Sequence, residues 1–491
     1  MSDVMPSPIH LDKVVEGLAT NPALPAELVR RLFAHRKGFG SVAKRPDLTD
    51  EMIDEIMALD DHWLTHALAL NRSLPHTFRM MLTEHPDPDI RAALVIASDG
   101  APRELFERLV GDADQHVREF LAERDHLPTD LRVRLAADPD PEIRATLAQC
   151  WTQAPEAVRR LLLTDPEDAV RAAACATYYR RLPHPVPPAD LMPTLLADPI
   201  TRAGAVRHCT LDADTARFLA DDPDYKVRRE LAAHPDLPPP LRDKLAQDPS
   251  PRVRLRVFAR QDTPAPTRAA IHAQILSDAP SLDGPGRLPV LDDDASAQQF
   301  IMSQMARVEL RTMRLPWVTA DPLPYVHSPY TCFRVSAAMS ESLPDPVVAR
   351  LLHDEKSSVR TTMALHARDR VDSATAERID RTYRMEKKTL WRPADDFPLP
   401  VEALRRLATD PDPRMRQLAP RDLDLPMELI GRLAADPEYT VRRVIAAHRK
   451  LPPRELTRLL ADPSERVAIV AAGSPNLPVE HMHELLALAG L

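Results

Sequence analysis

Apolar residues recur along this chain at helical spacing, and the pattern itself repeats about every 26 residues. The segment LAAHPDLPPPLRDKL at 231–245 has a close copy, IAAHRKLPPRELTRL, at 445–459. Within each copy the apolar positions fall three and four residues apart, which is typical of one buried face of an α-helix. One period holds two short helices, so the pattern predicts a solenoid of stacked two-helix repeats.

The first helix of each repeat is predicted to follow a Leu-Pro step. Proline fits the first helical turn, because its missing N–H would have no partner there. Helices of about ten residues are too short to be stable alone, so packing between repeats must stabilise them. The steps lie at 24–25, 74–75, 127–128, 237–238, 343–344, 399–400, 425–426, 451–452 and 477–478.

The second helix is predicted to follow an acidic step, usually Asp-Pro, in which Asp caps the helix and Pro begins it. An arginine usually comes six residues after the Asp; the last repeat departs from this, with Ala468 after Asp462. The two columns lie along the stack, so each Arg is expected to donate to the cap Asp of an adjacent repeat and form a structural ladder. The main pairs are Asp138 and Arg144, Asp165 and Arg171, Asp222 and Arg228, Asp248 and Arg254, Asp410 and Arg416, and Asp436 and Arg442.

Two repeat families share this pattern. The Asp-Pro step followed by Val227-Arg228 resembles a HEAT-like repeat, in which an Asp/Arg ladder is a hallmark. The longer pattern LAxHPxLPxxLxxxLAxDP resembles the leucine-rich repeat variant (LRV) family and covers most of 21–277 and 343–491. The resemblance implies an all-α fold, a right-handed α-solenoid of about 26-residue two-helix repeats with an armadillo-like superhelix.

The resemblance also bears on cofactors. Some LRV proteins carry an N-terminal cysteine cluster for an iron–sulfur centre, but here no cysteine precedes Cys150, so no cofactor is expected. The four cysteines are scattered without CxxC spacing, which indicates reduced, buried thiols in a cytoplasmic protein.

The repeat pattern is interrupted between Asp278 and Tyr330. This divides the chain into an N-terminal array (1–277), a divergent insert (278–330) and a C-terminal array (331–491). The insert holds a Gly-Pro-Gly loop, a longer helical stretch and an aromatic, proline-rich segment.

Aromatic residues are only 4% of the chain, so their density in the insert is unusual. Since aromatic side chains anchor interfaces, the insert is a candidate for partner binding. The alternative is an insert that plugs its own groove or links two half-arrays. A smaller interruption at 381–397 contains Lys387 and Lys388 and fits either nucleic-acid binding or a solvated connecting helix. The candidate partner-binding residues are Trp317, Tyr325, Tyr330, Phe333 and Trp391.

Composition narrows the function classes. The net charge of -9 with 28% charged residues of both signs argues against a general nucleic-acid binder. No secretory signal and no apolar run long enough to span a membrane is visible. The many Arg, Ala and Pro residues are typical of a high-GC bacterial gene.

No catalytic motif is present: the sequence lacks G-x-S-x-G, a Walker loop, H-E-x-x-H and a Gly-rich dinucleotide turn. His62 and His66 lie beside Asp60 and Asp61, but His66 is interpreted as a substituted ladder residue rather than a metal ligand. One further polar column is expected to bond free backbone groups at the end of the second helix. Its members are Asn21, Asn71, His234, His448 and Ser474.

These observations favour a non-enzymatic scaffold that binds another protein, without naming the partner or the oligomeric state. A first alternative is a nucleic-acid-binding, DNA-repair type of HEAT-like solenoid, with the arginine column lining a basic concave face. Because nearly every such Arg has its own Asp, the column lacks the surplus positive charge that DNA needs. A second alternative is a self-assembling solenoid, since the chain ends in apolar ELLALAGL without an evident polar cap.

Overall fold

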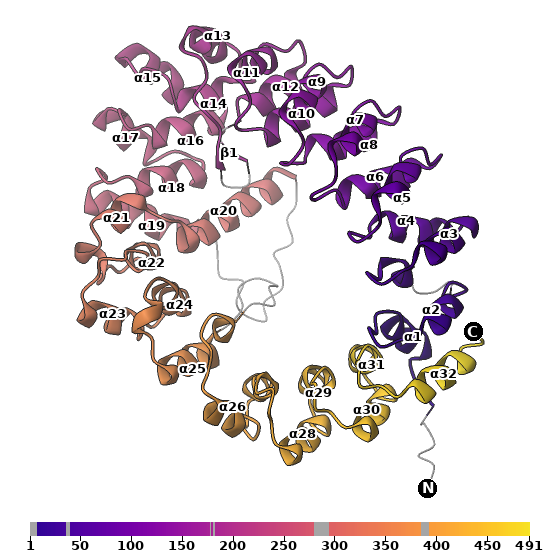
Figure 1. Cartoon of the computed structure of the whole chain (residues 1–491). Helices are drawn as coiled ribbons and strands as arrows, with labels where there is room; N and C mark the ends of the chain where they lie inside the picture. The colour runs from indigo at the N-terminus through magenta and orange to yellow at the C-terminus, as the bar shows by residue number, and fades with distance from the viewer. Residues whose placement is uncertain (1–6, 36–39, 177, 180–181, 279–293, 384–391) are drawn as a thin grey trace. The chain divides into compact units, whose positions relative to one another are not determined.

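The computed structural model describes residues 7–35, 40–176, 178–179, 182–278, 294–383 and 392–491 (Figure 1). In these ranges the regular secondary structure is helical apart from one antiparallel pair of two-residue strands. Short helices follow one another in pairs, so the prediction of an all-α repeat protein is confirmed.

The helices form two compact units. The first comprises residues 1–131, 376–381 and 390–491; the second comprises 132–375 and 382–389. The predicted division into 1–277, 278–330 and 331–491 concerns the repeat pattern along the chain and stays a prediction.

The first unit takes helices from both ends of the chain, and α9 (Thr129–Leu135) runs across its boundary. Its N-terminal elements are α1 (Leu11–Ala19), α2 (Ala26–Leu32), η1 (Ser41–Lys44), α3 (Asp50–Ala58), α4 (His62–Ala69), α5 (His76–Leu82), α6 (Pro88–Ile96), α7 (Arg103–Leu109) and α8 (Gln115–Ala122). Its C-terminal elements are η5 (Pro393–Asp395), α26 (Val401–Leu407), α27 (Pro413–Arg416), η6 (Ala419–Arg421), α28 (Met427–Ala434), α29 (Tyr439–Ala446), α30 (Pro453–Leu460), α31 (Glu465–Ala472) and α32 (Val479–Leu488).

The second unit contains the interrupted part of the repeat pattern. Before the insert lie α10 (Pro141–Cys150), α11 (Glu156–Leu163), α12 (Asp168–Ala174), β1 (Tyr178–Tyr179), β2 (Leu182–Pro183), η2 (Ala189–Leu191), α13 (Met192–Ala197), α14 (Arg202–Val206), α15 (Ala213–Ala220), α16 (Tyr225–Ala233), α17 (Pro239–Leu245), α18 (Pro251–Ala259) and α19 (Ala265–Asp278). From the insert onward lie α20 (Asp294–Thr312), α21 (Pro316–Ala320), η3 (Leu323–Tyr325), α22 (Thr331–Ala337), α23 (Asp345–Leu351), α24 (Ser357–His366) and η4 (Arg368–Arg370). Helix α25 (Ser373–Thr382) runs across the boundary, since residues 376–381 belong to the first unit.

The helix starts differ from the predicted ones in one respect. The Asp of the Asp-Pro step does not cap the second helix: Asp138 accepts a hydrogen bond from the Asp140 amide at 2.9 Å, and Asp140 is the residue that caps α10. The first residue of α10 is therefore Pro141 rather than Pro139. This turn before the helix leaves the carboxylate of the first Asp facing the adjacent repeat, where the ladder needs it.

The Asp and Arg columns meet in ion pairs between repeats. Arg228 donates to the two oxygens of the Asp248 carboxylate at 2.7 and 3.1 Å, and its third nitrogen donates to the Asp222 carbonyl at 2.7 Å. Each guanidinium thus links the start of its own helix to the next repeat. Arg–Asp pairs also join Arg91 to Asp112, Arg144 to Asp165, Arg171 to Asp198, Arg202 to Asp222, Arg254 to Asp278, Arg334 to Asp354, Arg416 to Asp436, and Arg442 to Asp462.

The second polar column joins each repeat to the one before it. The Asn71 side-chain amide donates to the carbonyls of Ala43 and Arg45 at 3.0 and 2.8 Å. His234 and His448 lie at the same position, and their Nε2 atoms contact the carbonyls of Cys209 and Asp422. As predicted, this column satisfies carbonyls at the end of a second helix, and that helix belongs to the preceding repeat.

The two ends of the chain use these same contacts with each other. In the first unit, the indigo helices α1 and α2 pack against the yellow helices α31 and α32 (Figure 1). The Asn21 amide donates to the carbonyls of Ala472 and Ser474 at 2.9 and 2.7 Å, as Asn71 does to its preceding repeat. We call this contact of α1 and α2 with α31 and α32 the terminal interface.

The terminal interface completes a repeat. Helix α32 follows a Leu-Pro step and is a first helix, whereas α1 precedes a Leu-Pro step and is a second helix. Helix α1 packs on both α32 and α31, so one repeat is assembled from the two ends of the chain. The prediction that the apolar C-terminal helix lacks a cap is therefore wrong: Leu485 and Leu486 are fully buried. Leu488 of the same segment is 53% exposed, so the self-assembly alternative stays a prediction.

Candidate binding site in the insert

The described part of the insert lies against the repeats on either side of it. The 19-residue helix α20 packs on α18, α19 and α22, and the short helix α21 packs on α22 (Figure 1). The Leu-Pro pattern is interrupted in this part of the sequence, and here aromatic side chains make the contacts between elements.

The aromatic residues of the insert pack around Phe333. Trp317 meets Tyr325 and Phe333 edge to face, with ring centroids 5.2 and 5.5 Å apart. Tyr330 lies 5.4 Å from Phe333 and 5.2 Å from Phe258 of α18. Such pairs contribute about 0.5–1.5 kcal/mol each beyond the burial of apolar area. The cluster therefore fastens the insert to the preceding repeat.

Arg268 of α19 adds a buried cation to this cluster. Its guanidinium lies 5.2 Å from the Phe333 ring centroid and 5.8 Å from that of Trp317. It donates to the Phe258 carbonyl at 3.1 Å, while Trp317 Nε1 donates to the Ala259 carbonyl at 2.9 Å. Burial lowers the pKa of the Arg268 guanidinium. Stacking on the rings and hydrogen bonds to the carbonyls compensate for this loss of solvation.

The predicted partner-binding residues differ in their exposure. Phe333 is 1% exposed, so its ring belongs to the core. Trp317, Tyr325 and Tyr330 are half-buried. Trp391 lies outside the described residues, as do Lys387 and Lys388.

An apolar stripe on α20 was missed by sequence reasoning. Ile301, Met305 and Val308 are 56%, 46% and 57% exposed. Their spacing of four and three residues places them on one face of the helix. The signal was present in the sequence, but the pattern also fits a helix that buries this face, and only the fold shows which face of α20 is covered.

A second set of residues that the sequence interpretation overlooked is an arginine column in the first helices. Arg79, four residues after the Pro of its Leu-Pro step, is 6% exposed. It donates to the carbonyls of Leu74 and Ala97, both at 2.9 Å. The repeated Pro-x-x-x-Arg spacing was the available signal. The column is structural, and its other members are Arg132, Arg159, Arg242 and Arg268.

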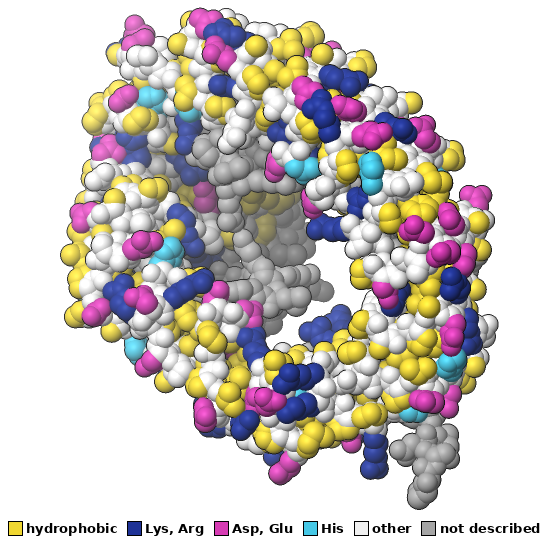
Figure 2. Space-filling model, viewed as in Figure 1, with side chains coloured by type: hydrophobic (Ala, Val, Ile, Leu, Met, Phe, Trp, Pro, Cys, Tyr) yellow, Lys and Arg dark blue, Asp and Glu magenta, His cyan; other side chains and the backbone are white. Residues whose placement is uncertain are grey.

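The surface carries charge of both signs. On the face shown in Figure 2, Lys and Arg side chains stand beside Asp and Glu side chains, with hydrophobic side chains between them. The ladder pairs lie largely beneath this surface. The side chains of Arg144 and Asp165, for example, are only 12% and 5% exposed. An arginine held in this way has little surface left for a DNA backbone.

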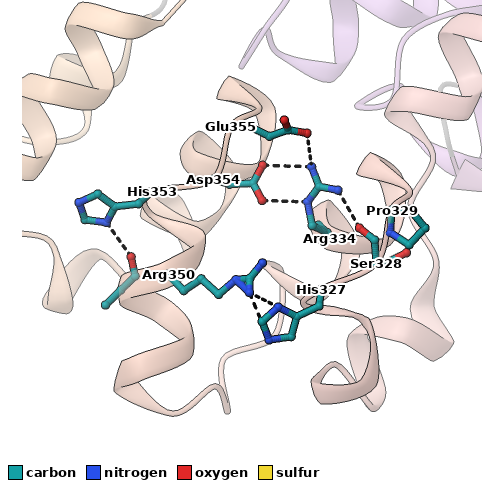
Figure 3. Close-up of a pocket in the computed structure, with 9 residues that line it drawn as sticks. His327, Ser328, Pro329, Arg334, Arg350, His353, Asp354 and Glu355 are labelled. Carbon is teal, nitrogen blue, oxygen red and sulfur yellow. Dashed lines mark hydrogen bonds and ion pairs between the residues drawn. The ribbon is translucent and has the colours of Figure 1, made fainter.

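One cavity beside η3 is lined by charged groups that satisfy each other (Figure 3). It has a volume of about 580 Å³ and lies between His327 and Asp354. Arg334 donates to the Asp354 carboxylate at 2.8 and 3.2 Å and to Glu355 at 3.3 Å, and Arg350 contacts His327. The cavity is open and its charges are paired, so it offers no distinctive chemistry to a ligand.

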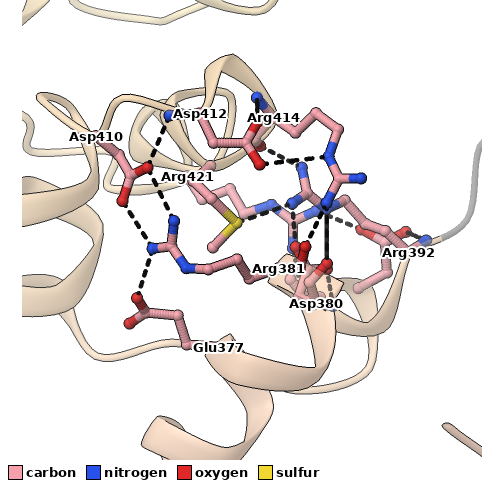
Figure 4. Close-up of polar contacts among 11 residues, drawn as sticks. Glu377, Asp380, Arg381, Arg392, Asp410, Asp412, Arg414 and Arg421 are labelled. Atoms are coloured by element: carbon pink, nitrogen blue, oxygen red, sulfur yellow. Dashed lines mark hydrogen bonds and ion pairs between the residues drawn. The ribbon is translucent and has the colours of Figure 1, made fainter. Parts of the chain in front are cut away.

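The smaller interruption contains an ion-pair network (Figure 4). Arg381 donates to the Asp410 carboxylate at 3.0 and 2.7 Å, and this hydrogen bonding lowers the pKa of Asp410. Arg392 donates to the 2%-exposed Asp380 at 3.0 Å and to the Arg414 carbonyl at 2.7 Å. These two arginines join repeats to one another, whereas residues 384–391 lie outside the described residues, so both interpretations of this interruption stay predictions.

His62 and His66, which suggested a metal site, have other surroundings in the structure. In the ladder, Arg228 lies six residues before His234 of the polar column. The residue six positions before Asn71 of the same column is Thr65. The interpretation of His66 as a ladder residue is therefore wrong by one position. His62 Nδ1 contacts the Asp87 carboxylate at 2.8 Å, and burial lowers the pKa of His66. In the described ranges, no group of three or more His, Cys, Asp or Glu residues could hold a metal ion.

Comparison with known proteins supports the architecture. Residues 225–250, which contain α16 and α17, match the family model described as leucine rich repeat variant. The chain is a helical repeat protein. No curated protein matches this helical repeat protein. A crystal structure of an engineered protein is similar at 14% identity over 96% of this chain and 99% of that chain, but its TM-score of 0.12 is too low to support any argument.

One finding bears on membranes. Within the part of the chain that the structure describes, no helix is both long enough and apolar enough to cross a bilayer.

Proposed function

We propose that this protein is a non-enzymatic α-solenoid scaffold that binds a protein partner on helix α20. The observation that carries the proposal is the exposed apolar stripe of Ile301, Met305 and Val308. Single exposed hydrophobic residues are ordinary, but a continuous line of them on one helix marks an interaction surface. The half-buried Trp317, Tyr325 and Tyr330 extend the proposed contact region.

The form of the stripe suggests the kind of partner. An amphipathic helix can lay its apolar face along a row of apolar side chains that are spaced four and three residues apart. We therefore propose an amphipathic segment of another protein as the ligand of α20.

The nucleic-acid alternative has less support. The arginine column is paired with carboxylates along the array, and the described arginines of the smaller interruption are held by Asp380 and Asp410. Binding to the phosphate backbone requires positive charge in excess.

A pull-down from the native cell lysate with nuclease added tests this proposal. The bait is the full chain, as wild type and as an Ile301→Ser/Met305→Ser/Val308→Ser variant. A photo-crosslinker at position 305 then identifies the protein that touches α20. We expect one protein to be retained by the wild type, lost by the variant, and crosslinked through an amphipathic segment.

A matched control uses exposed apolar residues elsewhere. Leu423 and Met427, 56% and 55% exposed, are changed to Ser in a second variant. Equal loss of the partner in both variants contradicts a specific role for α20. Recovery of nucleic acid, or of proteins only when nuclease is omitted, favours the nucleic-acid solenoid instead.

A further inference from the structure

Helices α3 and α4 pack on each other and form a repeat that lacks the ladder (Figure 1). Its two ladder positions hold Leu59 and Thr65 in place of Asp and Arg. The ladder Asp is buried in other repeats, as Asp138 is at 7% exposure, whereas Leu59 is 44% exposed. On the first turn of α4, Trp63 is 52% exposed. This repeat therefore presents two large apolar side chains to solvent.

The exposed face of α3 is acidic. Seven Asp and Glu residues and no Lys or Arg occur between Pro46 and His66. Residues one turn apart share a face of a helix, so the acids of α3 form one exposed face that continues to Leu59 at the end of the helix. We call this face, together with Trp63, the α3 surface. Its acids are Asp50, Glu51, Asp54 and Glu55.

Much of this negative charge has no cationic partner in the described part of the chain. Two acids of the segment are paired, Asp47 with Arg45 at 2.6 Å and Glu55 with Arg30 at 2.9 Å. No group of three or more His, Cys, Asp or Glu residues in the described ranges could hold a metal ion. The carboxylates that form no ion pair within those ranges are Asp50, Asp54 and Asp60.

The stability of α3 does not account for all of these acids. Asp50 and Glu51 can stabilise the first turn, because carboxylates interact favourably with a helix N-terminus. Asp54 lies one turn further on and forms a like-charge pair with Asp50, and such pairs destabilise a helix. A local cost to folding without a local benefit is typical of a functional surface.

We propose that the α3 surface binds a basic segment of another protein. Asp50, Asp54 and Asp60 pair with its Lys and Arg side chains, which matches opposite charges across the interface. Trp63 binds one of these cations over its ring and, with Leu59, packs against their apolar stems. Among aromatic rings Trp binds cations best, and interfaces are centred on such anchors.

This goes beyond the proposed scaffold function and does not rest on it. The α3 surface belongs to the first compact unit, whereas α20 belongs to the second. The two surfaces also differ in chemistry, because the stripe on α20 is apolar and the α3 surface is acidic.

Titration of fluorescein-labelled octa-arginine with the full chain, followed by fluorescence anisotropy at fixed ionic strength, tests the proposal. The first variant is Asp50→Asn/Asp54→Asn/Asp60→Asn, which removes charge and keeps side-chain shape. Asn also adopts the left-handed conformation that Asp60 has at φ 47°. The second variant is Trp63→Leu, which removes the ring and keeps an apolar side chain.

A matched control removes the same number of charges elsewhere. Glu402→Gln/Glu428→Gln/Glu480→Gln changes three exposed carboxylates on α26, α28 and α32 of the same unit. Affinities are measured well below the melting temperature of each variant, so that a loss of binding reports on the surface and not on unfolding.

We expect saturable binding by the wild type, weakened about tenfold in the triple Asp variant and about threefold in Trp63→Leu. The control variant and the Ile301→Ser/Met305→Ser/Val308→Ser variant should bind as the wild type does. Three results overturn the proposal: no saturable binding by the wild type, unchanged affinity in Trp63→Leu, or equal weakening in the control, which would show attraction to net charge alone.

Discussion

At the terminal interface α1 meets α31 through the contacts that join successive repeats elsewhere, whereas at the insert α20 and α21 bring contacts of a different kind. Asn21 reaches the Ala472 and Ser474 carbonyls just as Asn71 reaches those of Ala43 and Arg45. At the insert, aromatic rings around Phe333 hold the structure together.

The comparison shows which parts of a repeat are replaceable. The polar column persists where the chain ends meet, because exposed helix-end carbonyls need donors wherever two repeats stack. The ladder does not persist there: Ala468 occupies the arginine position, and His10 Nε2 donates to the Pro463 carbonyl at 2.9 Å instead. A region freed from the repeat can also carry exposed apolar and cationic side chains, and the insert carries both.

The largest expected effect is in the aromatic cluster. Phe333→Ala removes a ring that is 1% exposed and leaves a cavity, so we expect the free energy of unfolding to fall by about 3–5 kcal/mol. Denaturant unfolding measures the change. The control is Phe218→Ala, whose ring is 59% exposed, and a similar loss in both variants would contradict the central role of Phe333.

The terminal interface is tested at Gly17. A Cβ atom at this position would lie 2.2 Å from the Ile469 carbonyl oxygen, so α1 must move away from α31 in Gly17→Ala. We expect a loss of about 2–3 kcal/mol, as for other overpacked contacts. Gly431 has no atoms within 4 Å of such a Cβ, and Gly431→Ala is expected to stabilise by about 0.5–1 kcal/mol through helix propensity. If Gly17→Ala is equally stabilising, the two ends of the chain do not pack as described.

The ladder is tested at Arg228. Arg228→Ala leaves the buried Asp248 carboxylate without its main donor, and we expect a loss of about 1–3 kcal/mol by thermal or denaturant unfolding. Arg432→Ala, on an exposed surface, should change stability by less than about 0.5 kcal/mol. Unchanged stability together with a lost binding activity would mean that the arginine column is functional rather than structural.

The ladder should also make stability depend on acid pH. Burial alone would raise the pKa of Asp436, but hydrogen bonds from Arg416 and the Glu438 amide hold that pKa below its ordinary value of 3.8. A carboxylate with a lowered folded-state pKa stabilises fully above its unfolded value, and this contribution is lost as pH falls through the folded pKa.

We therefore expect stability to fall below about pH 3.8. Each such carboxylate contributes up to about 1.4 kcal/mol per pH unit in that window. Arg416→Ala should reduce the slope by about one proton, whereas Phe333→Ala should leave it unchanged because the aromatic contacts do not titrate. Stability curves at several acid pH values compare the two variants, and equal slopes in the wild type and Arg416→Ala would contradict the assignment.

The smallest effect on stability is expected at α20. Met305→Ser replaces a side chain that is 46% exposed, so stability should change by less than about 0.5 kcal/mol. Loss of partner binding without loss of stability would show that the stripe serves binding, whereas the aromatic cluster around Phe333 serves stability. A large destabilisation would show instead that Met305 is covered in solution.

The sequence predicted the structure most accurately where the same residues recur from one repeat to the next. Asp222, Arg228 and His234 recur at fixed positions, and recurrence at a period of about 26 residues specifies stacked helix pairs. It was less accurate at helix starts, where Asp140 rather than Asp138 caps α10, because both residues can form local hydrogen bonds. It also misaligned His66, since the two ladder positions of that repeat hold Leu59 and Thr65 in place of Asp and Arg.

The residue pattern alone specifies the two-helix repeat, the positions of its ladder and polar columns, and the place where the pattern breaks. These features depend on contacts between neighbouring repeats, and such contacts leave a periodic trace in the chain. The fold was needed to show that α1 completes the repeat begun by α32, that Phe333 is buried, and that the stripe on α20 is exposed. Each of these depends on which surfaces meet across long stretches of chain, and a non-recurring contact leaves no period in the sequence.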